Sequence, residues 1–181
     1  MGPLRREHRR PVRLFLRQNI SSLWPTWGYT IYRTAYTPES ESAWPSLLTK
    51  LVAYIHYEIF EEIREHEKYF ELTHGPLAPS PNEEVWATYK PRIMSDKGLY
   101  DGASVEDIRR FWKADVEGRG EPINGSRTGD NVCLVINEEV FAMVRDAPEP
   151  DKLVERENRA WIRVIDGAWK PEHNEGKYTG V

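Results

Sequence analysis

The order of strand-like and helix-like segments constrains the fold of this chain more than any other sequence feature. Four runs rich in β-branched and aromatic residues are predicted to be strands: 27–36, 85–94, 132–136 and 160–166. The spacing of apolar residues predicts helices from 42 to about 72, from 104 to about 117 and over 138–146. The order is therefore strand, helix, strand, helix, strand, helix, strand.

Local signals support several of these boundaries. Pro91 lacks a backbone N–H and therefore suits an edge strand or a strand end. The continuous apolar run VCLVI over 132–136 is typical of a central strand that is buried on both faces. Ser104 and Asn137 are residues that cap helices well, and Pro148 is expected to stop the helix that Asn137 begins.

This order of elements predicts an α+β ferredoxin-like two-layer sandwich. The expected sheet has four antiparallel strands, with a long first helix and a helix inserted between the second and third strands. Right-handed crossovers place the long helix and the 138–146 helix on one face of the sheet. The other face is then left to the inserted helix, to a second subunit or to a ligand.

The length of 181 residues fits a single domain with its own core. We expect a basic N-terminal arm over 1–22, one α+β domain over 23–170 and an irregular tail over 171–181. Six arginines and one glutamate give residues 1–20 a formal charge of +5; since the whole chain is at −4, the remainder carries −9. The arm and the body therefore differ in sign.

An arginine-rich start has three explanations that the sequence leaves open. It is compatible with an arm on the protein's own acidic surface, with a mitochondrial presequence or with a phosphate-binding arm. Pro3 and Pro11 interrupt a presequence helix, which favours the first explanation. We expect a cytoplasmic protein, with mitochondria as the alternative.

Composition excludes several classes of function. The single cysteine, Cys133, lies in an apolar run and is expected to be a small buried residue in a reducing compartment. No stretch is long and apolar enough for a membrane span. The acidic body and the absence of nucleic-acid-binding motifs argue against DNA or RNA as a partner. The sequence predicts neither a cofactor nor a metal site.

Four segments together resemble a large group of uncharacterised fungal proteins: WGYTIYRTAYTPESESAW, YDGASVEDIRRFW, VCLVINEEVFAMV and AWIRVIDGAWKPE. The shared pattern is a W-G-x-x-I-Y-R strand, a D-G-A-S helix start and a V-x-N/D-E-E turn. Asn137 stands where that group usually carries an aspartate, and both residues cap helices. The resemblance implies a fungal origin and a single domain. It implies no reaction and no catalytic residue.

The segment HYEIFEEIREHEKYFELTH, residues 56–74, holds three of the five histidines among six glutamates. Glu62 and His66 are four residues apart and project toward the apolar side of the predicted helix, where an unpaired polar group is costly. They are candidates for proton transfer or for two ligands of a metal, although a metal needs further ligands. A pair that hydrogen-bonds at the margin of the core is the alternative. His56 is a weaker catalytic candidate and is expected at the boundary of the core.

The first strand offers a candidate ligand surface. Alternation places Tyr32, Thr34 and Tyr36 on one face and Arg33 on the other. Hydroxyl groups along one face suit a small polar-aromatic ligand, although the same residues are ordinary strand formers. Arg33 is expected to bind an anionic group or to pair with an acidic neighbour such as Asp166.

Two classes of function remain open from the sequence. The first is an intracellular ligand- or protein-binding module whose partner is a small hydrophobic molecule, another protein or a second copy of the chain. The second is a small cofactor-independent enzyme, an isomerase, cyclase or lyase, that acts on a hydrophobic metabolite by acid/base chemistry. Absent motifs do not decide between them, because such an enzyme needs only one or two ionisable groups.

Overall fold

The computed structural model describes residues 26–74, 83, 86–120, 131–150, 162–167 and 169, and only the backbone of residues 58, 59 and 61–74. The chain divides into two compact units. One unit comprises Met1–Trp27, Pro45–Lys90 and Ala147–Arg159, and the other comprises Gly28–Trp44, Pro91–Asp146 and Ala160–Val181. The predicted arm over 1–22 and the tail over 171–181 lie outside the described residues.

The second unit contains a four-stranded sheet in the order β2-β1-β3-β4. Its strands are β1 (Thr30–Arg33), β2 (Arg92–Met94), β3 (Val132–Ile136) and β4 (Arg163–Asp166). Strand β1 pairs in parallel with both β2 and β3, and only β3 and β4 are antiparallel. The predicted antiparallel ferredoxin-like sheet is therefore wrong, although the protein is α+β.

The connection between β2 and β3 explains this difference. Two consecutive strands that run in the same direction within one sheet require a crossover that carries the chain back to the starting edge of the sheet. Helix α5 (Val105–Gly118) is that crossover, and its residues Ile108, Trp112 and Val116 are buried. A helix predicted as an insertion between antiparallel strands is instead the element that makes β2 and β3 run in the same direction.

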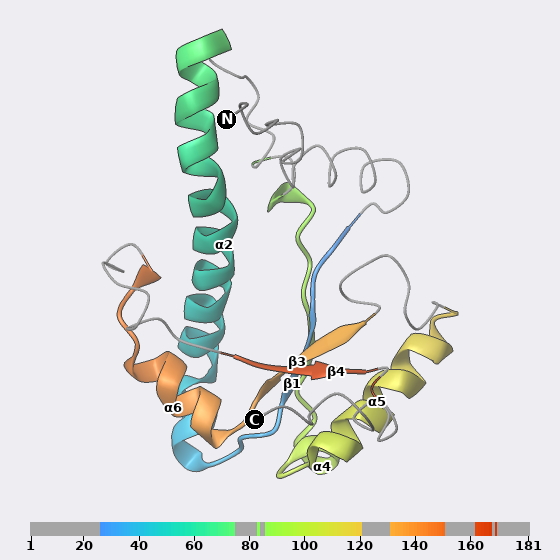
Figure 1. Ribbon diagram of the computed structural model, residues 1–181. Helices are drawn as coiled ribbons and strands as arrows, with labels where there is room; N and C mark the ends of the chain where they lie inside the picture. Colours follow the sequence, from blue (N-terminus) through green and yellow to red (C-terminus); the bar gives the residue numbers. More distant parts are fainter. Residues whose placement is uncertain are drawn as a thin grey trace, which may run out of the picture. The chain divides into compact units, whose positions relative to one another are not determined.

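Helices α5 and α6 (Glu138–Asp146) lie on opposite sides of the sheet (Figure 1). One core cluster lies between the sheet and the pair formed by α5 and the short helix α4 (Lys97–Tyr100). We call this cluster the α5 layer; its buried members are Tyr32, Tyr36, Tyr100, Ile108, Trp112, Val116, Cys133, Val135 and Ile165. It contains most of the aromatic rings that are buried in this unit.

Caps and turns agree with the sequence in several places. Ser104 caps α5 and forms a capping box with Asp107. Asn137 caps α6 by accepting a hydrogen bond from the Val140 N–H at 3.0 Å. Gly102 adopts a φ of 65°, the left-handed backbone that glycine tolerates best, and donates its N–H to Thr34 O at 3.2 Å.

Several predicted boundaries shift. The strand predicted over 27–36 is reduced to β1, Thr30–Arg33. Helix α2 spans Pro38–His74 and begins earlier than expected, because Pro38 suits a first helical position and Ser40 N–H donates to Thr37 Oγ1 at 3.2 Å. The predicted strand over 85–94 is reduced to β2. Tyr89 makes only an isolated parallel bridge, which it forms with Trp27.

The first unit contains most of α2. Lys50 Nζ and Tyr54 OH donate hydrogen bonds to the carbonyls of Ala147 and Pro148, which attaches the segment after α6 to this helix. Within the described part of the chain, no helix is both long and apolar enough to cross a bilayer.

Candidate functional site

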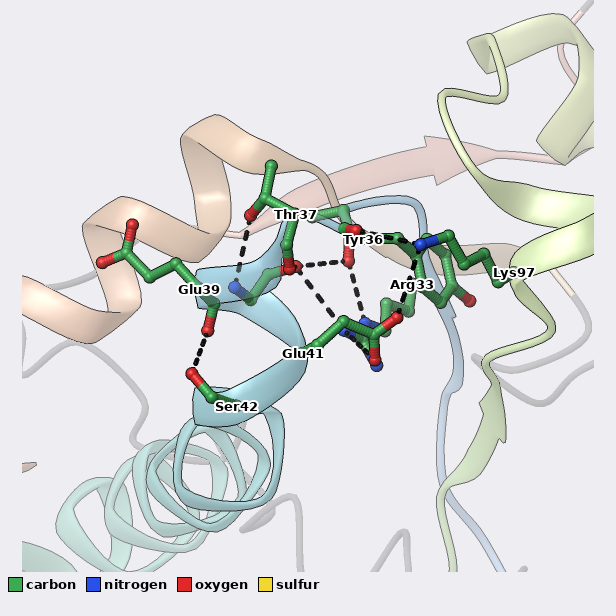
Figure 2. A network of polar contacts seen from close by, with 9 residues as sticks. Arg33, Tyr36, Thr37, Glu39, Glu41, Ser42 and Lys97 are labelled. Carbon is green, nitrogen blue, oxygen red and sulfur yellow. Dashed lines mark hydrogen bonds and ion pairs between the residues drawn. The ribbon is translucent and has the colours of Figure 1, made fainter.

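Arg33, the last residue of β1, is the centre of a buried polar network (Figure 2). Only 5% of its surface is exposed, and its guanidinium lies 4.4 Å from the Tyr36 ring centre and 4.6 Å from that of Trp44. Arg33 Nε donates to Ala35 O at 2.9 Å, and Nη2 lies 3.2 Å from Glu41 Oε2. The positive charge is thus enclosed by two rings, a carbonyl and a carboxylate.

The first turns of α2 complete this network. Ser40 is fully buried, and its Oγ lies 2.9 Å from Ala35 O and 3.0 Å from Thr37 O. Lys97 Nζ donates to Tyr36 O at 3.3 Å and lies 3.8 Å from a carboxylate oxygen of Glu41. Because these polar groups bind one another, the network joins the end of β1 to α2 and to α4.

The expected pairing of Arg33 with Asp166 is not present; the acidic partner is Glu41. The register of the sheet gives the reason. Arg33 is opposite Ile136 at the end of β3, whereas Asp166 is opposite Val132 at its beginning. The two residues therefore lie at opposite ends of the sheet.

Thr34 also has a structural role. Its N–H donates to Ile136 O at 2.9 Å, and its hydroxyl lies 3.4 Å from the same oxygen. These contacts extend the pairing of β1 and β3 beyond the strand end. Of the predicted ligand-binding residues, Arg33 and Thr34 are therefore occupied by contacts within the fold.

Tyr32 and Tyr36 both belong to the α5 layer, as the predicted alternation requires. Tyr32 is fully buried, and its ring meets that of Tyr100 edge-on at 5.3 Å. Burial raises the pKa of the Tyr32 hydroxyl above its ordinary value, and Cys133 and Asp115 raise it further. Burial also raises the pKa of Tyr36, to about 12. Both hydroxyls therefore remain protonated hydrogen-bond donors at neutral pH.

These two hydroxyls have no hydrogen-bond partner among the described residues, and neither has Trp112 Nε1 nor Arg92 Nη1. Tyr32, Tyr36 and Trp112 are members of the α5 layer, and Arg92 reaches the layer from β2. Buried polar atoms in native proteins nearly always have partners, so several exceptions in one layer call for an explanation. All four atoms can donate a hydrogen bond.

Arg92 lies at the margin of this layer, on the outermost strand of the described sheet. Its Nη2 donates to Asp115 Oδ1 at 2.7 Å, while 40% of the Arg92 side chain and 16% of the Asp115 side chain remain exposed. At the β2 edge, this ion pair beside the α5 layer is therefore in contact with solvent.

Cys133 is fully buried beside these groups, as the sequence predicts. Burial raises the pKa of its thiol to about 12. The thiol is therefore protonated at neutral pH and is a poor nucleophile.

The candidates on the long helix fall in the other unit. Glu62 and His66 are part of α2, but their side chains lie outside the described residues, so the proposed pair stays a prediction. The His56 ring stacks on Phe60 at 4.2 Å and meets Trp86 edge-on at 4.6 Å. This partly buried position agrees with a residue at the boundary of a core. The described side chains include no group of three His, Cys, Asp or Glu residues that could hold a metal ion.

Sequence reasoning missed Arg92, Trp112 and Asp115 as members of a polar site. A weak signal was present, because Asp115 follows Trp112 by three residues and so shares a face of α5 with this apolar side chain. Whether the Trp112 and Arg92 nitrogens have hydrogen-bond partners depends on how the layer packs, and the sequence does not show this packing.

Comparison with known proteins found no match among protein families, among curated proteins or among solved structures. Function therefore has to be inferred from the side chains themselves.

Proposed function

We propose that the chain is a ligand-binding module that takes up a small, largely apolar molecule in the α5 layer. The observation that supports this is the group of unpartnered buried donors, Tyr32 OH, Tyr36 OH, Trp112 Nε1 and Arg92 Nη1. Small-molecule sites are mostly apolar and carry a few polar groups that orient the ligand. The α5 layer has this composition, with Ile108, Val116, Val135 and Ile165 beside the donors.

Access to this site requires a local opening. Tyr32 and Trp112 are fully buried, so the ligand occupies space that α5 must vacate. A pocket that is closed in the free protein and stabilised by its ligand is a recognised mode of binding. The β2 edge, where Arg92 is partly exposed, is the point at which the opening begins.

A small molecule is favoured over a protein partner by the described surface. The large hydrophobic side chains exposed on it are Leu99 and Val164, which belong to α4 and β4. Scattered apolar residues of this kind are normal for any soluble surface and do not make a protein-binding patch. The enzymatic alternative depends on Glu62 and His66 and stays a prediction.

A ligand screen observed by NMR tests this function. The indole N–H signal of Trp112, assigned with a Trp112→Phe variant, reports on the α5 layer, and amide exchange along α5 reports on its opening. We expect at least one small apolar compound to shift the Trp112 signal and to slow amide exchange in α5. An Arg92→Met/Tyr32→Phe variant should weaken this binding about tenfold, since two hydrogen bonds are lost.

The matched control is Arg110→Met, because Arg110 is 71% exposed and pairs with Asp107 outside the layer. It should leave binding unchanged. The proposed function is wrong if the compounds that bind leave Trp112 and the α5 amides unaffected.

A further inference from the structure

We infer that the molecule bound in the α5 layer is uncharged and presents hydrogen-bond acceptor oxygens, as a ketone, lactone or ester on an apolar ring does. This inference rests on the proposed function and specifies its ligand. It follows from the kind of polar atom that lacks a partner and from the free-energy cost of burying a charged group.

The unpartnered atoms have a common chemistry. Trp112 Nε1 and Arg92 Nη1 can only donate, and the hydroxyls of Tyr32 and Tyr36 each carry one proton to donate. A purely hydrocarbon ligand would leave all of these donors unsatisfied, which costs free energy for each buried group. An acceptor oxygen on the ligand relieves that cost.

The charged groups beside the layer are already paired with one another. Arg92 lies 2.7 Å from one oxygen of Asp115, and Arg119 lies 3.1 Å from the other. At the Tyr32 hydroxyl, Asp115 raises the pKa and opposes the effect of Arg92.

The Tyr36 hydroxyl also lies among charges of both signs. Arg33 lowers its pKa, whereas Asp96, Glu41 and Asp101 raise it. Arg33 itself is held by Glu41 and by the rings that enclose it. A carboxylate placed in the layer would be stripped of water, and burying that charge costs far more free energy than burying a carbonyl oxygen.

Three compounds that share a benzene ring and are similar in size test the inference on the unmodified full chain: acetophenone, benzoate and ethylbenzene. Affinities are measured from the shift of the Trp112 indole N–H signal. We expect acetophenone to bind about three- to tenfold more tightly than ethylbenzene, which is the effect of one or two neutral hydrogen bonds. Benzoate should bind most weakly of the three.

Variants identify the donors. A Tyr32→Phe/Tyr36→Phe variant keeps both rings and should lower the preference for acetophenone over ethylbenzene by at least half. Tyr57→Phe, a matched change on α2 outside the α5 layer, should leave this preference unchanged.

The outcomes separate the two proposals. If acetophenone and ethylbenzene both shift the Trp112 signal and bind with equal affinity, the layer binds small molecules but the inference about acceptor oxygens is wrong. If benzoate binds as tightly as acetophenone, the site does not discriminate against a charged ligand and the inference is again wrong. If no compound shifts Trp112, both the inference and the proposed function are contradicted.

Discussion

The network around Arg33 and the α5 layer both hold buried polar groups, but they satisfy them differently. In the Arg33 network, the guanidinium and the Ser40 hydroxyl each have partners within the fold. In the α5 layer, the hydroxyls of Tyr32 and Tyr36 have none among the described residues. A satisfied network stabilises a fold, whereas unsatisfied donors reduce stability and leave binding capacity for another molecule.

The two regions are adjacent in the sequence, which makes the contrast informative. Arg33 follows Tyr32 directly, and alternation along β1 sends the two side chains to opposite faces of the sheet. Arg33, the charged residue of this strand, therefore has a structural role. The tyrosine beside it is the better candidate for ligand binding.

The largest effect is expected when the satisfied network is broken. Arg33→Met should lower the free energy of unfolding by about 3 kcal/mol, because it removes the buried member of an ion pair and two cation–π contacts. Urea denaturation measures this change. Arg110→Met removes an exposed ion pair and should cost no more than about 0.5 kcal/mol. Equal losses for the two variants would show that the Arg33 network contributes little.

A smaller loss is expected where the α5 layer is tightly packed. A Cβ added at Gly167 would lie 2.0 Å from a ring carbon of Trp112, so Gly167→Ala should destabilise the fold by about 2 kcal/mol. Gly118→Ala, where a Cβ meets nothing within 4 Å, is the matched control and should be neutral or slightly stabilising. A tolerated Gly167→Ala would mean that the Trp112 ring can move aside without loss of packing.

The α5 layer should also make the protein sensitive to alkaline pH. The pKa of Cys133 is raised from 9.0 to about 12 by burial, so above pH 9 the unfolded chain releases this proton while the folded chain retains it. Stability should therefore fall with rising pH by up to about 1.4 kcal/mol per pH unit from this group, and the decline should end near the folded pKa.

Urea midpoints from pH 8 upward measure this slope. Cys133→Val should reduce the slope, because the variant has no thiol to titrate. The same slope in both proteins would exclude Cys133 as a cause.

Much of the local structure could be predicted from the sequence, because caps and turns depend on neighbouring residues. Ser104 and Asn137 have the predicted roles. The direction of strand pairing could not be predicted in the same way, since the apolar face of α5 suits an inserted helix as well as a crossover. The two-sided burial of VCLVI was the available sign of parallel pairing.

The candidate site was predictable only in part. The predicted alternation placed Tyr32 and Tyr36 on one face, and both belong to the α5 layer, although Tyr36 lies beyond the end of β1. Arg92 and Asp115 join them from segments distant in the sequence, so neither periodicity nor spacing could indicate their contact. The partner of Arg33 was missed because the register of the sheet, which separates it from Asp166, cannot be read from the sequence.

Deleting one buried hydroxyl from each region tests the central contrast most directly. Ser40→Ala removes a hydroxyl that lies within hydrogen-bonding distance of two carbonyls, and it should lower the free energy of unfolding by about 1–2 kcal/mol. Tyr32→Phe removes a hydroxyl with no described partner, and it should leave stability unchanged or raise it by up to about 1 kcal/mol. If Tyr32→Phe instead costs as much as Ser40→Ala, the Tyr32 hydroxyl is already satisfied in the free protein and the α5 layer has no vacant donor there for a ligand.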